Sequence, residues 1–307
     1  MPIIVPALSS TGSVAYQWID PTGTTRTLSG GAASVTVRQA TGLGVPPVKL
    51  SEDKLAFVSG TLVRHAAVQS REIELSLLAQ GASAAALEDI FDDLRQWFAT
   101  ADERSRTPGY LQITRPDGSV RQIAAYYAGG LESDTTKGTS LHHRTSLSLL
   151  APDPFFTDTA DTTATYTTAS STTTWFPFFP LVLGINDVLT TPNIINSGDV
   201  DAYPIWTITG PGTNPTAQNT TTGELWQLNM TLLSGETVIV DTRPSSQRTD
   251  PSVYDGYGNN RFGDLVTTSR LWWLQPGENR VSLALGNATG GSSIALAYRP
   301  RYWGAIR

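Results

Sequence analysis

Histidine and serine residues are the first candidates in this sequence for binding a metal or driving hydrolysis. The three histidines are His65, His142 and His143. Adjacent residues on a strand point to opposite faces, so His142 and His143 are poorly placed to ligate one ion together. Ser140 and Ser146 lie nearby, but not in the G-x-S-x-G turn of a serine hydrolase. We therefore expect no metal site, no cofactor and no catalytic triad.

Carboxylates offer a second chemistry, because two acids from distant strands can form a glycosidase pair. No such pair stands out in the sequence. Asp89, Asp92 and Asp93 fall on the polar face of a predicted helix, where they are most simply solvated. The segment D-G-Y-G-N-N at 255–260 has oxygen ligands suited to calcium, but the bidentate glutamate of an EF-hand loop is missing. We interpret this segment as a turn and expect no enzyme activity.

Aromatic side chains are the remaining candidates, for binding rather than catalysis. Trp272 and Trp273 belong to an aromatic second half, and exposed aromatics on a β-sandwich can stack on sugar rings. Because side chains alternate along a strand, one of these two tryptophans is expected to point into the core. A separate apolar run, residues 175–183, is long enough that we expect its burial against a domain or a neighbouring subunit. The interface candidates in this run are Trp175, Phe176, Phe178 and Phe179.

The composition is that of a folded, mildly acidic chain. It has 307 residues, a net charge of −6 and lysine only at Lys49, Lys54 and Lys137. Tight nucleic-acid binding needs clustered basic residues, so that role is disfavoured. The absence of cysteine excludes thiolate zinc sites and disulfides. The first residues do not resemble a secretory signal, and no apolar run approaches the about 18 residues that span a bilayer, so we expect cytoplasmic synthesis and no membrane insertion.

The first half is predicted to be β-structure. A long extended segment covers 60–79, in which Ile73, Leu75 and Leu77 share one face and polar residues, Arg71 among them, surround that face. Pro-Asp-Gly at 116–118 predicts a hairpin between two strands. Shorter alternation predicts further strands. The remaining strands are expected at 35–38, 110–114, 120–127 and 144–150.

One amphipathic helix is predicted within this half. Ser83 is a suitable N-cap, and apolar residues then recur at offsets of three and four. We expect the apolar stripe to pack across the sheet. The stripe consists of Leu87, Ile90, Phe91, Leu94, Trp97 and Phe98.

The second half is predicted to be a jelly-roll-like β-sandwich, because short strands alternate with turns rich in Gly, Pro, Asn and Asp. Two prolines in A-P-D-P-F-F, followed by a Thr/Ser tract, separate the halves. The expected domains are 1–156, a connection at 157–192, and 193–307. The expected strands are 204–209, 225–232, 237–242, 270–274, 279–285 and 293–298.

Several motifs, in order, carry a family resemblance. In the first half these are R-E-I-E-L-S-L-L, the helix ending L-R-Q-W-F, P-G-Y-L-Q-I-T-R-P-D-G-S-V-R-Q-I, Y-Y-A-G-G-L-E and A-P-D-P-F-F. In the second half they include D-A-Y-P-I-W-T-I-T-G-P-G-T-N-P and S-R-L-W-W-L-Q-P-G-E-N-R-V. The first half resembles the amino-terminal domain of the distal tail proteins of long, non-contractile-tailed bacteriophages. The second half resembles the carboxy-terminal module of related phage tail proteins.

The resemblance implies a structural virion protein of the phage tail tip. Such proteins form a hexameric ring whose first domain surrounds a channel, while a galectin-like second domain faces outward. The implied partners are further copies of the chain, the tail tube and hub proteins, and also tape measure and receptor-binding proteins. DNA would only pass through the channel, which suits a mildly acidic surface. The resemblance brings no catalytic residue.

Two other functions remain open at this point. The second domain could be a carbohydrate-binding module that recognises the host cell surface, with Trp272 or Trp273 as the stacking residue. The chain could also be a glycan-degrading tail enzyme, although no residues can be nominated for that reaction.

Overall fold

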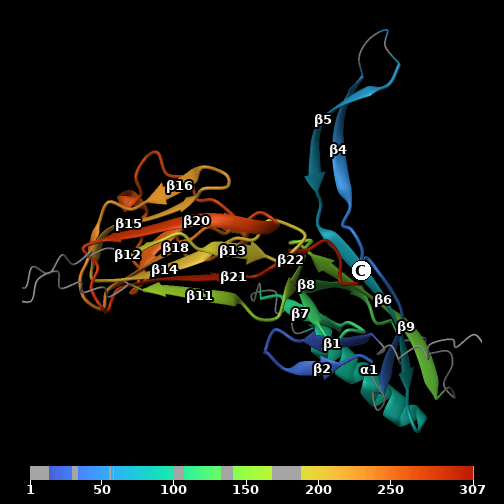
Figure 1. Ribbon diagram of the computed structural model, residues 1–307. Coiled ribbons are helices and arrows are strands. Elements are labelled where there is room, and N and C mark those ends of the chain that lie inside the picture. The colour runs from blue at the N-terminus through green and yellow to red at the C-terminus, as the bar shows by residue number, and fades with distance from the viewer. Residues whose placement is uncertain are drawn as a thin grey trace, which may run out of the picture. The chain divides into compact units, whose positions relative to one another are not determined.

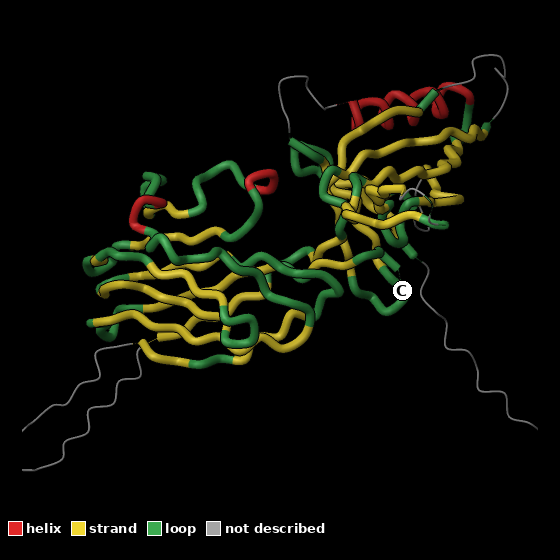
Figure 2. Tube along the Cα trace, turned by 90° about the horizontal axis from the view of Figure 1, so that it is seen from above, coloured by secondary structure: helices red, strands yellow, loops and turns green. Residues whose placement is uncertain are grey.

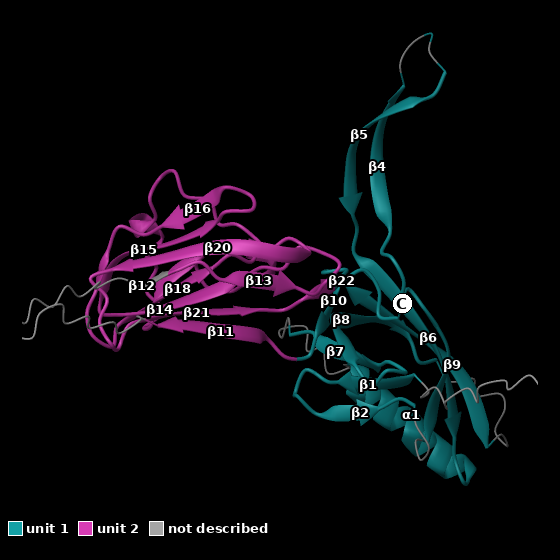
Figure 3. Ribbon diagram, viewed as in Figure 1, with its two compact units in different colours: residues 1–159, 302–307 teal, residues 160–301 magenta. Residues whose placement is uncertain are grey.

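The computed structural model describes residues 14–29, 34–54, 57, 59–99, 107–132, 141–167 and 188–306. It divides the chain into two compact units, shown in teal and magenta in Figure 3. The first unit comprises Met1–Thr159 together with Tyr302–Arg307, and the second comprises Ala160–Arg301. The first unit is therefore discontinuous, because the chain returns to it after building the second.

The first unit is built on a nine-stranded sheet (Figure 1). Its main path runs β2-β1-β7-β8-β9-β6-β3, and β10 and β22 pair outside this path. Strands β4 and β5 form a separate two-stranded sheet. The strands are β1 (Ala15–Ile19), β2 (Thr25–Thr27), β3 (Val35–Thr41), β4 (Val48–Lys54), β5 (Thr61–Val68), β6 (Arg71–Gln80), β7 (Gly109–Thr114), β8 (Val120–Gly130), β9 (His142–Ala151), β10 (Phe156–Asp158) and β22 (Arg301–Tyr302).

Helix α1 (Ala84–Ala99) lies along one face of this sheet (Figure 2). The hydroxyl of Ser83 accepts a hydrogen bond from the backbone N–H of Ala86 at 3.1 Å, which confirms the predicted N-cap. On the helix, Phe98 packs against Trp18 of β1 with ring centroids 4.8 Å apart. The Trp18 indole N–H also donates to the carbonyl of Trp97 at 3.2 Å. The predicted amphipathic helix and its apolar stripe are thus observed.

The strand predicted across 60–79 is two strands in two different sheets. Its first part, β5, pairs only with β4, whereas β6 pairs with β3 and β9. Within β6 the inward residues are Ile73, Leu75 and Leu77, as predicted, but the fourth member of that row is Arg71, which is 1% exposed. Strand alternation places residues 71, 73, 75 and 77 on one face, so Arg71 lies in the inward row, whereas Glu72 and Glu74 lie on the opposite face.

The second unit is a β-sandwich of two antiparallel sheets, ordered β11-β21-β14-β18-β19 and β12-β20-β15-β16, with β13 pairing β20 and β17 pairing β15. The chain is thus mainly β. Two single-turn helices, η1 (Ser245–Gln247) and η2 (Phe262–Asp264), lie in loops. The strands are β11 (Thr162–Thr167), β12 (Val188–Thr190), β13 (Asn193–Asn196), β14 (Ile205–Thr209), β15 (Gly212–Asn219), β16 (Glu224–Gln227), β17 (Thr231–Leu232), β18 (Thr237–Asp241), β19 (Val253–Asp255), β20 (Gly277–Gly286) and β21 (Ser293–Tyr298).

Three tryptophans occupy the core between these sheets. Trp206 of β14 lies edge-to-face against Trp226 of β16 at 6.0 Å and against Trp272 at 5.4 Å. The Trp272 indole N–H donates to the carbonyl of Ala217 at 3.1 Å, and its side chain is fully buried. Its neighbour Trp273 is 39% exposed. Trp272 is therefore a core residue and is withdrawn as a binding candidate, because a buried ring offers no face to a ligand.

Two boundaries differ from those expected. Thr162–Thr167, assigned to the connection at 157–192, pairs with Ser293–Tyr298 as strand β11 of the sandwich. Its alternating Thr, Ala and Tyr residues are those of an edge strand, although the polar composition suggested a spacer. Tyr302–Arg307, assigned to the second domain, belongs to the first unit. The interface candidates Trp175, Phe176, Phe178 and Phe179 lie outside the described residues.

The C-terminal segment closes the first unit. Tyr302 and Ala305 are buried there, and β22 pairs with β10. The guanidinium of Arg121 stacks on the Tyr302 ring at 3.6 Å and donates to the carbonyl of Gly304. The Tyr302 hydroxyl donates to a carboxylate oxygen of Asp158 at 3.1 Å. The first unit therefore needs residues from both ends of the described chain.

No helix among the described residues is long and apolar enough to cross a membrane.

We predict that Trp272→Ala destabilises the second unit by about 3–5 kcal/mol, because it leaves a cavity among three packed indoles and removes a buried hydrogen bond. Trp273→Ala, on the neighbouring and partly exposed side chain, is the matched control and should cost about 1 kcal/mol or less. Denaturant unfolding of both variants, followed by tryptophan fluorescence, measures the difference. Equal losses in the two variants would contradict the assignment of Trp272 to the core.

We also predict that Asp158→Asn gains stability over the wild type as pH rises. Burial raises the pKa of Asp158, against the opposing hydrogen bond from Tyr302 and the positive charges of Arg121 and Arg115. Because the folded state disfavours the charged carboxylate, the wild type loses unfolding free energy as pH rises through the folded pKa. The asparagine stays neutral and keeps an oxygen for Tyr302.

The measurement is the free energy of unfolding of both proteins between about pH 3 and about pH 7. The difference should be smallest at the acid end and grow in favour of the variant. The same substitution at an exposed helix position, Asp89→Asn, provides the baseline. A difference that does not change with pH would contradict the burial argument.

Candidate functional site

The β4–β5 hairpin is the most exposed ordered element of the first unit. Its rungs pair Val48 with Val68 and Leu50 with Ala66, and a bulge between Ser51 and Glu52 shifts the register. The two strands pair with no other described strand, and every residue of β4 is exposed. In Figure 1 the hairpin extends away from the sheet that carries it. A two-stranded hairpin of this kind is marginal in water without a third element to cover it.

Apolar side chains gather on this hairpin. Seven of the sixteen large exposed apolar side chains among the described residues lie between positions 45 and 68. Such a concentration on an uncovered sheet marks an interaction surface, and unpaired strand edges can also accept a further strand. The seven are Val45, Val48, Leu50, Phe57, Leu62, Val63 and Val68.

Polar contacts shape the outer part of the hairpin. Arg64 pairs with Asp53 across the strands at 2.7 Å, and the Thr61 hydroxyl donates to Glu52 at 3.0 Å. All four side chains are solvent-exposed, where such pairs contribute little stability. The hairpin thus presents apolar groups beside charges of both signs, which is the composition of a protein interface with a polar rim rather than of a core.

One buried arginine holds the base of the hairpin. The Arg71 guanidinium donates to four backbone carbonyls: to Pro154 at 2.8 Å, and to Gly42, Gly44 and Trp303 at 2.6 Å each. It also lies over the ring of Phe156. Burial lowers the pKa of Arg71 to about 10, so the guanidinium stays charged at neutral pH. We call this cluster the Arg71 node.

Gly42 allows the chain to reach this node. Its φ is +77°, and a side chain there would place Cβ 2.1 Å from the carbonyl oxygen of Glu72. Only glycine adopts that conformation at that distance without strain. The turn at Gly42 therefore brings the entry to β4 close to the start of β6, where Arg71 stands.

The outward face of the large sheet carries a group of carboxylates and hydroxyls on β6 and β9. Glu74 of β6 stands opposite Ser148 of β9, and the next outward-facing pair is Ser76 with Ser146. The Ser148 hydroxyl donates to the exposed Glu72 carboxylate at 3.0 Å. Carboxylates and hydroxyls at these positions offer no positive charge to a phosphate, although the exposed Arg144 lies further along the same face of β9.

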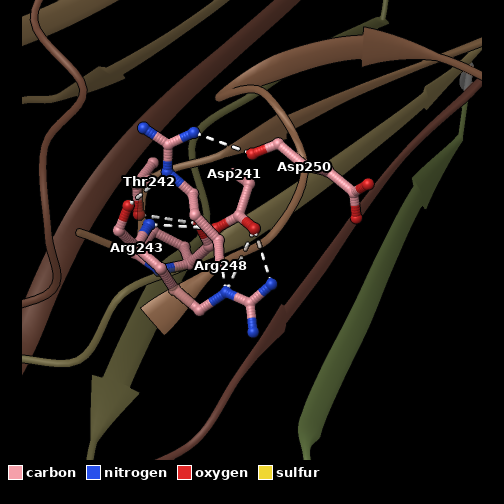
Figure 4. A network of polar contacts seen from close by, with 6 residues as sticks. Asp241, Thr242, Arg243, Arg248 and Asp250 are labelled. Atoms are coloured by element: carbon pink, nitrogen blue, oxygen red, sulfur yellow. Dashed lines mark hydrogen bonds and ion pairs between the residues drawn. The ribbon is translucent and has the colours of Figure 1, made fainter. Parts of the chain in front are cut away.

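In the second unit, a polar network fixes the loop between β18 and β19 (Figure 4). The buried carboxylate of Asp241 receives a bidentate contact from Arg243, with Nη2 at 2.6 Å and Nε at 3.0 Å. That hydrogen bond is the main reason that the pKa of Arg243 is raised. Arg248 donates to the backbone carbonyls of Arg243 and Asp250, and Thr242 donates to that of Pro204. We interpret the network as structural.

The segment 255–260 forms a closed turn, as predicted. One carboxylate oxygen of Asp255 accepts hydrogen bonds from the backbone N–H groups of Tyr257 and Asn259, at 3.0 and 2.9 Å. The hydrogen bonds from Asn259, above all that of its side chain, lower the pKa of Asp255. The turn leaves the Tyr257 ring 90% exposed. Together with Trp273 this ring is an exposed aromatic of the second unit.

The histidines do not form a site. His143 packs edge-to-face against Phe91 of the helix at 5.2 Å, while His142 and His65 are exposed on different sheets. Among the described residues, no group of three metal-ligating side chains is brought together. The hairpin and the Arg71 node are candidate features that were not predicted from the sequence. Their available signals were the V-K-L-S-E-D-K strand and the position of Arg71 in the inward row of β6.

Comparisons with known proteins agree with this architecture. Residues 197–302 match the family described as siphovirus-type tail component, C-terminal domain. The structure of the SPP1 Dit (gp 19.1) protein, described as a paradigm of hub adsorption apparatus in phages that infect Gram-positive bacteria, aligns with a TM-score of 0.63 at 15% identity. The alignment covers 94% of this chain and 99% of that one.

A chain of the phage P2 baseplate in its activated conformation with Ca aligns with a TM-score of 0.54 at 10% identity. It covers 94% of this chain and 98% of that one, and the form with Sr gives a TM-score of 0.53. No curated protein sequence matches. Residues 197–302 thus match the siphovirus-type tail component model, and the fold of the chain is similar to that of the SPP1 Dit protein, in agreement with the resemblance that the sequence motifs indicated.

Proposed function

We propose that this structural tail protein assembles into a hexameric ring that joins the tail tube to the hub and the receptor-binding apparatus. The observation that carries the proposal is the uncovered β4–β5 hairpin. Leu50 and Leu62 are almost half exposed on a two-stranded sheet that has no covering layer among the described residues. A surface of this kind calls for a partner in the assembled state.

A further copy of the chain is the partner that best fits the hairpin. A hairpin that reaches onto the next copy makes a head-to-tail contact, and such contacts leave no unsatisfied surface when the ring closes. Each copy then gives one hairpin and receives another. Support for a role in such an assembly comes from the related folds, one from a hub adsorption apparatus and one from a baseplate.

The polar sheet face suits a channel through which DNA passes. Glu72 and Glu74 would repel phosphates, and the neutral hydroxyls of Ser146 and Ser148 would add no electrostatic attraction for DNA. In the proposed ring this face of the first unit lines the lumen. Tail tube and hub proteins would stack on the two sides of the ring, with tape measure and receptor-binding proteins as further partners in the virion tail.

Carbohydrate binding by the second unit is a separate candidate, favoured by the exposed Tyr257 ring on its Asp255-bound turn. A rigid exposed ring can stack on a sugar at low entropic cost. Glycan-array binding by the wild type that Tyr257→Ala or Trp273→Ala abolishes, with unchanged unfolding, would support this candidate. Absence of binding to host-surface glycans would remove it.

We predict that Leu50→Asp with Leu62→Asp abolishes ring formation while leaving the fold intact. Both side chains are exposed in the single chain, so folding stability should change by no more than about 0.5 kcal/mol for each substitution. Buried charges in the ring contact, by contrast, would carry an unpaired desolvation cost. Sedimentation and electron microscopy should show wild-type rings of about 197 kDa, six chains of 32.9 kDa, and a monomeric variant.

Leu233→Asp is the matched control, because Leu233 is 65% exposed on a turn of the second unit. It introduces the same charge far along the chain from the hairpin and should leave ring formation unchanged. A wild type that stays monomeric at high concentration and beside its tail partners would refute the ring. A double variant that assembles normally would refute the hairpin as its contact.

A further inference from the structure

We propose that Arg71 and residues 302–305 act as a latch that sets the position of the β4–β5 hairpin. This inference deepens the proposed function, since it concerns how the ring contact is positioned. Its physical basis lies entirely within the first unit, and it can be tested on the single chain. Arg71 is then a positioning residue for the interface rather than a contact residue.

The latch holds the hairpin at both of its ends, just before β4 and just after β5. We call these two ends the roots of the hairpin. Gly44 precedes the first hairpin residue, Val48, by four positions, and Arg71 follows the last, Val68, by three. Among the described residues between these two points, one backbone hydrogen bond lies outside the strand rungs, from the N–H of Gln69 to the carbonyl of Pro47 at 2.8 Å. The direction in which the hairpin leaves the sheet therefore depends on how the Arg71 node holds its two ends.

The C-terminal segment supplies one quarter of the partners of this guanidinium. Nη2 of Arg71 donates to the carbonyl of Trp303, and the N–H of Ala305 donates to the carbonyl of Leu43 at 2.9 Å. Leu43 lies between the two glycines that also bind Arg71. Loss of the segment would leave a buried charged donor without a partner, and the loop 42–44 without one of its contacts. The loop and the guanidinium would both rearrange, and the hairpin roots with them.

The same segment continues directly from the second unit. The carbonyl of Arg301 accepts hydrogen bonds from the N–H groups of Asp199 and Val200, inside the second unit. The next residue, Tyr302, is clamped in the first unit by Arg121 and Asp158. The segment 302–305 therefore begins directly after the last residue of the second unit.

Lysine cannot replace arginine in this role. A guanidinium presents five donors in a fixed plane, and here that plane reaches carbonyls from three chain segments. An ammonium is a point charge with three donors, and it cannot contact carbonyls as far apart as those that the guanidinium bridges. Arg71→Lys keeps the charge and an apolar stem of similar length, so it separates the bridging geometry from the charge.

Hydrogen exchange on the full chain, at a concentration that keeps it monomeric, tests the latch. One variant ends at Arg301 and a second carries Arg71→Lys. The control ends at Ala305 and so retains every carbonyl that the node uses. We expect the amides of residues 42–48 and 66–71 to exchange roughly tenfold faster in both variants, while those of β14 and β18 stay unchanged. The control should match the wild type.

A second readout follows the position of the hairpin. The chain has no cysteine, so Leu62→Cys with Glu74→Cys allows a pair of spin labels on two exposed sites of the first unit. A narrow distance distribution in the wild type should broaden in both latch variants. If a folded variant keeps the narrow distribution and normal exchange at the hairpin roots, the proposal is wrong. It is also wrong if exchange rises equally throughout the first unit.

These outcomes do not depend on ring formation. A latch that behaves as expected in a chain that never assembles would leave the positioning role intact and refute the hexameric ring. Rings that form normally from chains with a loosened hairpin would refute the latch and leave the ring. If the shortened chain does not fold, Arg71→Lys alone decides the matter by the same two measurements.

Discussion

The first unit depends on the buried positive charge of Arg71, whose hydrogen bonds all go to backbone carbonyl oxygens and which also lies over the ring of Phe156. Taking a guanidinium out of water is costly, and the hydrogen bonds from Arg71 to Pro154, Gly42, Gly44 and Trp303 offset that cost only if all three chain segments that carry these carbonyls stay in place. The charge thus makes the positions of these separate chain segments depend on one another. An apolar residue there would pack, but it would not specify which loops meet.

This constraint explains why the two units differ in character. The sandwich is held by apolar packing around Trp206, Trp226 and Trp272, with a loop fastened by Asp241 and Arg243. Such a core tolerates variation of its surface, which suits a part of the molecule that meets variable surroundings. The first unit has an apolar core of its own around Trp18 and Phe98, and it adds directional contacts among distant segments. Directional contacts tolerate little displacement, which would suit a part that repeats identically in the proposed ring.

Most of the secondary structure followed from simple periodicity, and the failures have physical causes. The helix and β9 were predicted because a single apolar stripe faces a single core. Strand β15 was missed because Gly212 and Pro215 read as a turn, whereas the register shift between Thr213 and Thr216 accommodates the proline in the sheet. The position of Arg71 in the inward row of β6 indicated a buried arginine, but its acceptors could not be predicted, because they are backbone carbonyls that lie far apart in the sequence and carry no residue-type signature.

The return of the chain to its first unit imposes an order on biosynthesis. Residues 302–305 leave the ribosome only after the whole sandwich has been translated, so the guanidinium of Arg71 waits through some 230 residues of synthesis for its last acceptor. During that interval a nascent chain can form most of its large sheet but cannot complete it. A nascent chain whose second unit is not yet fully translated therefore lacks residues that the first unit needs. The first unit can complete its fold only after the second unit has been synthesised.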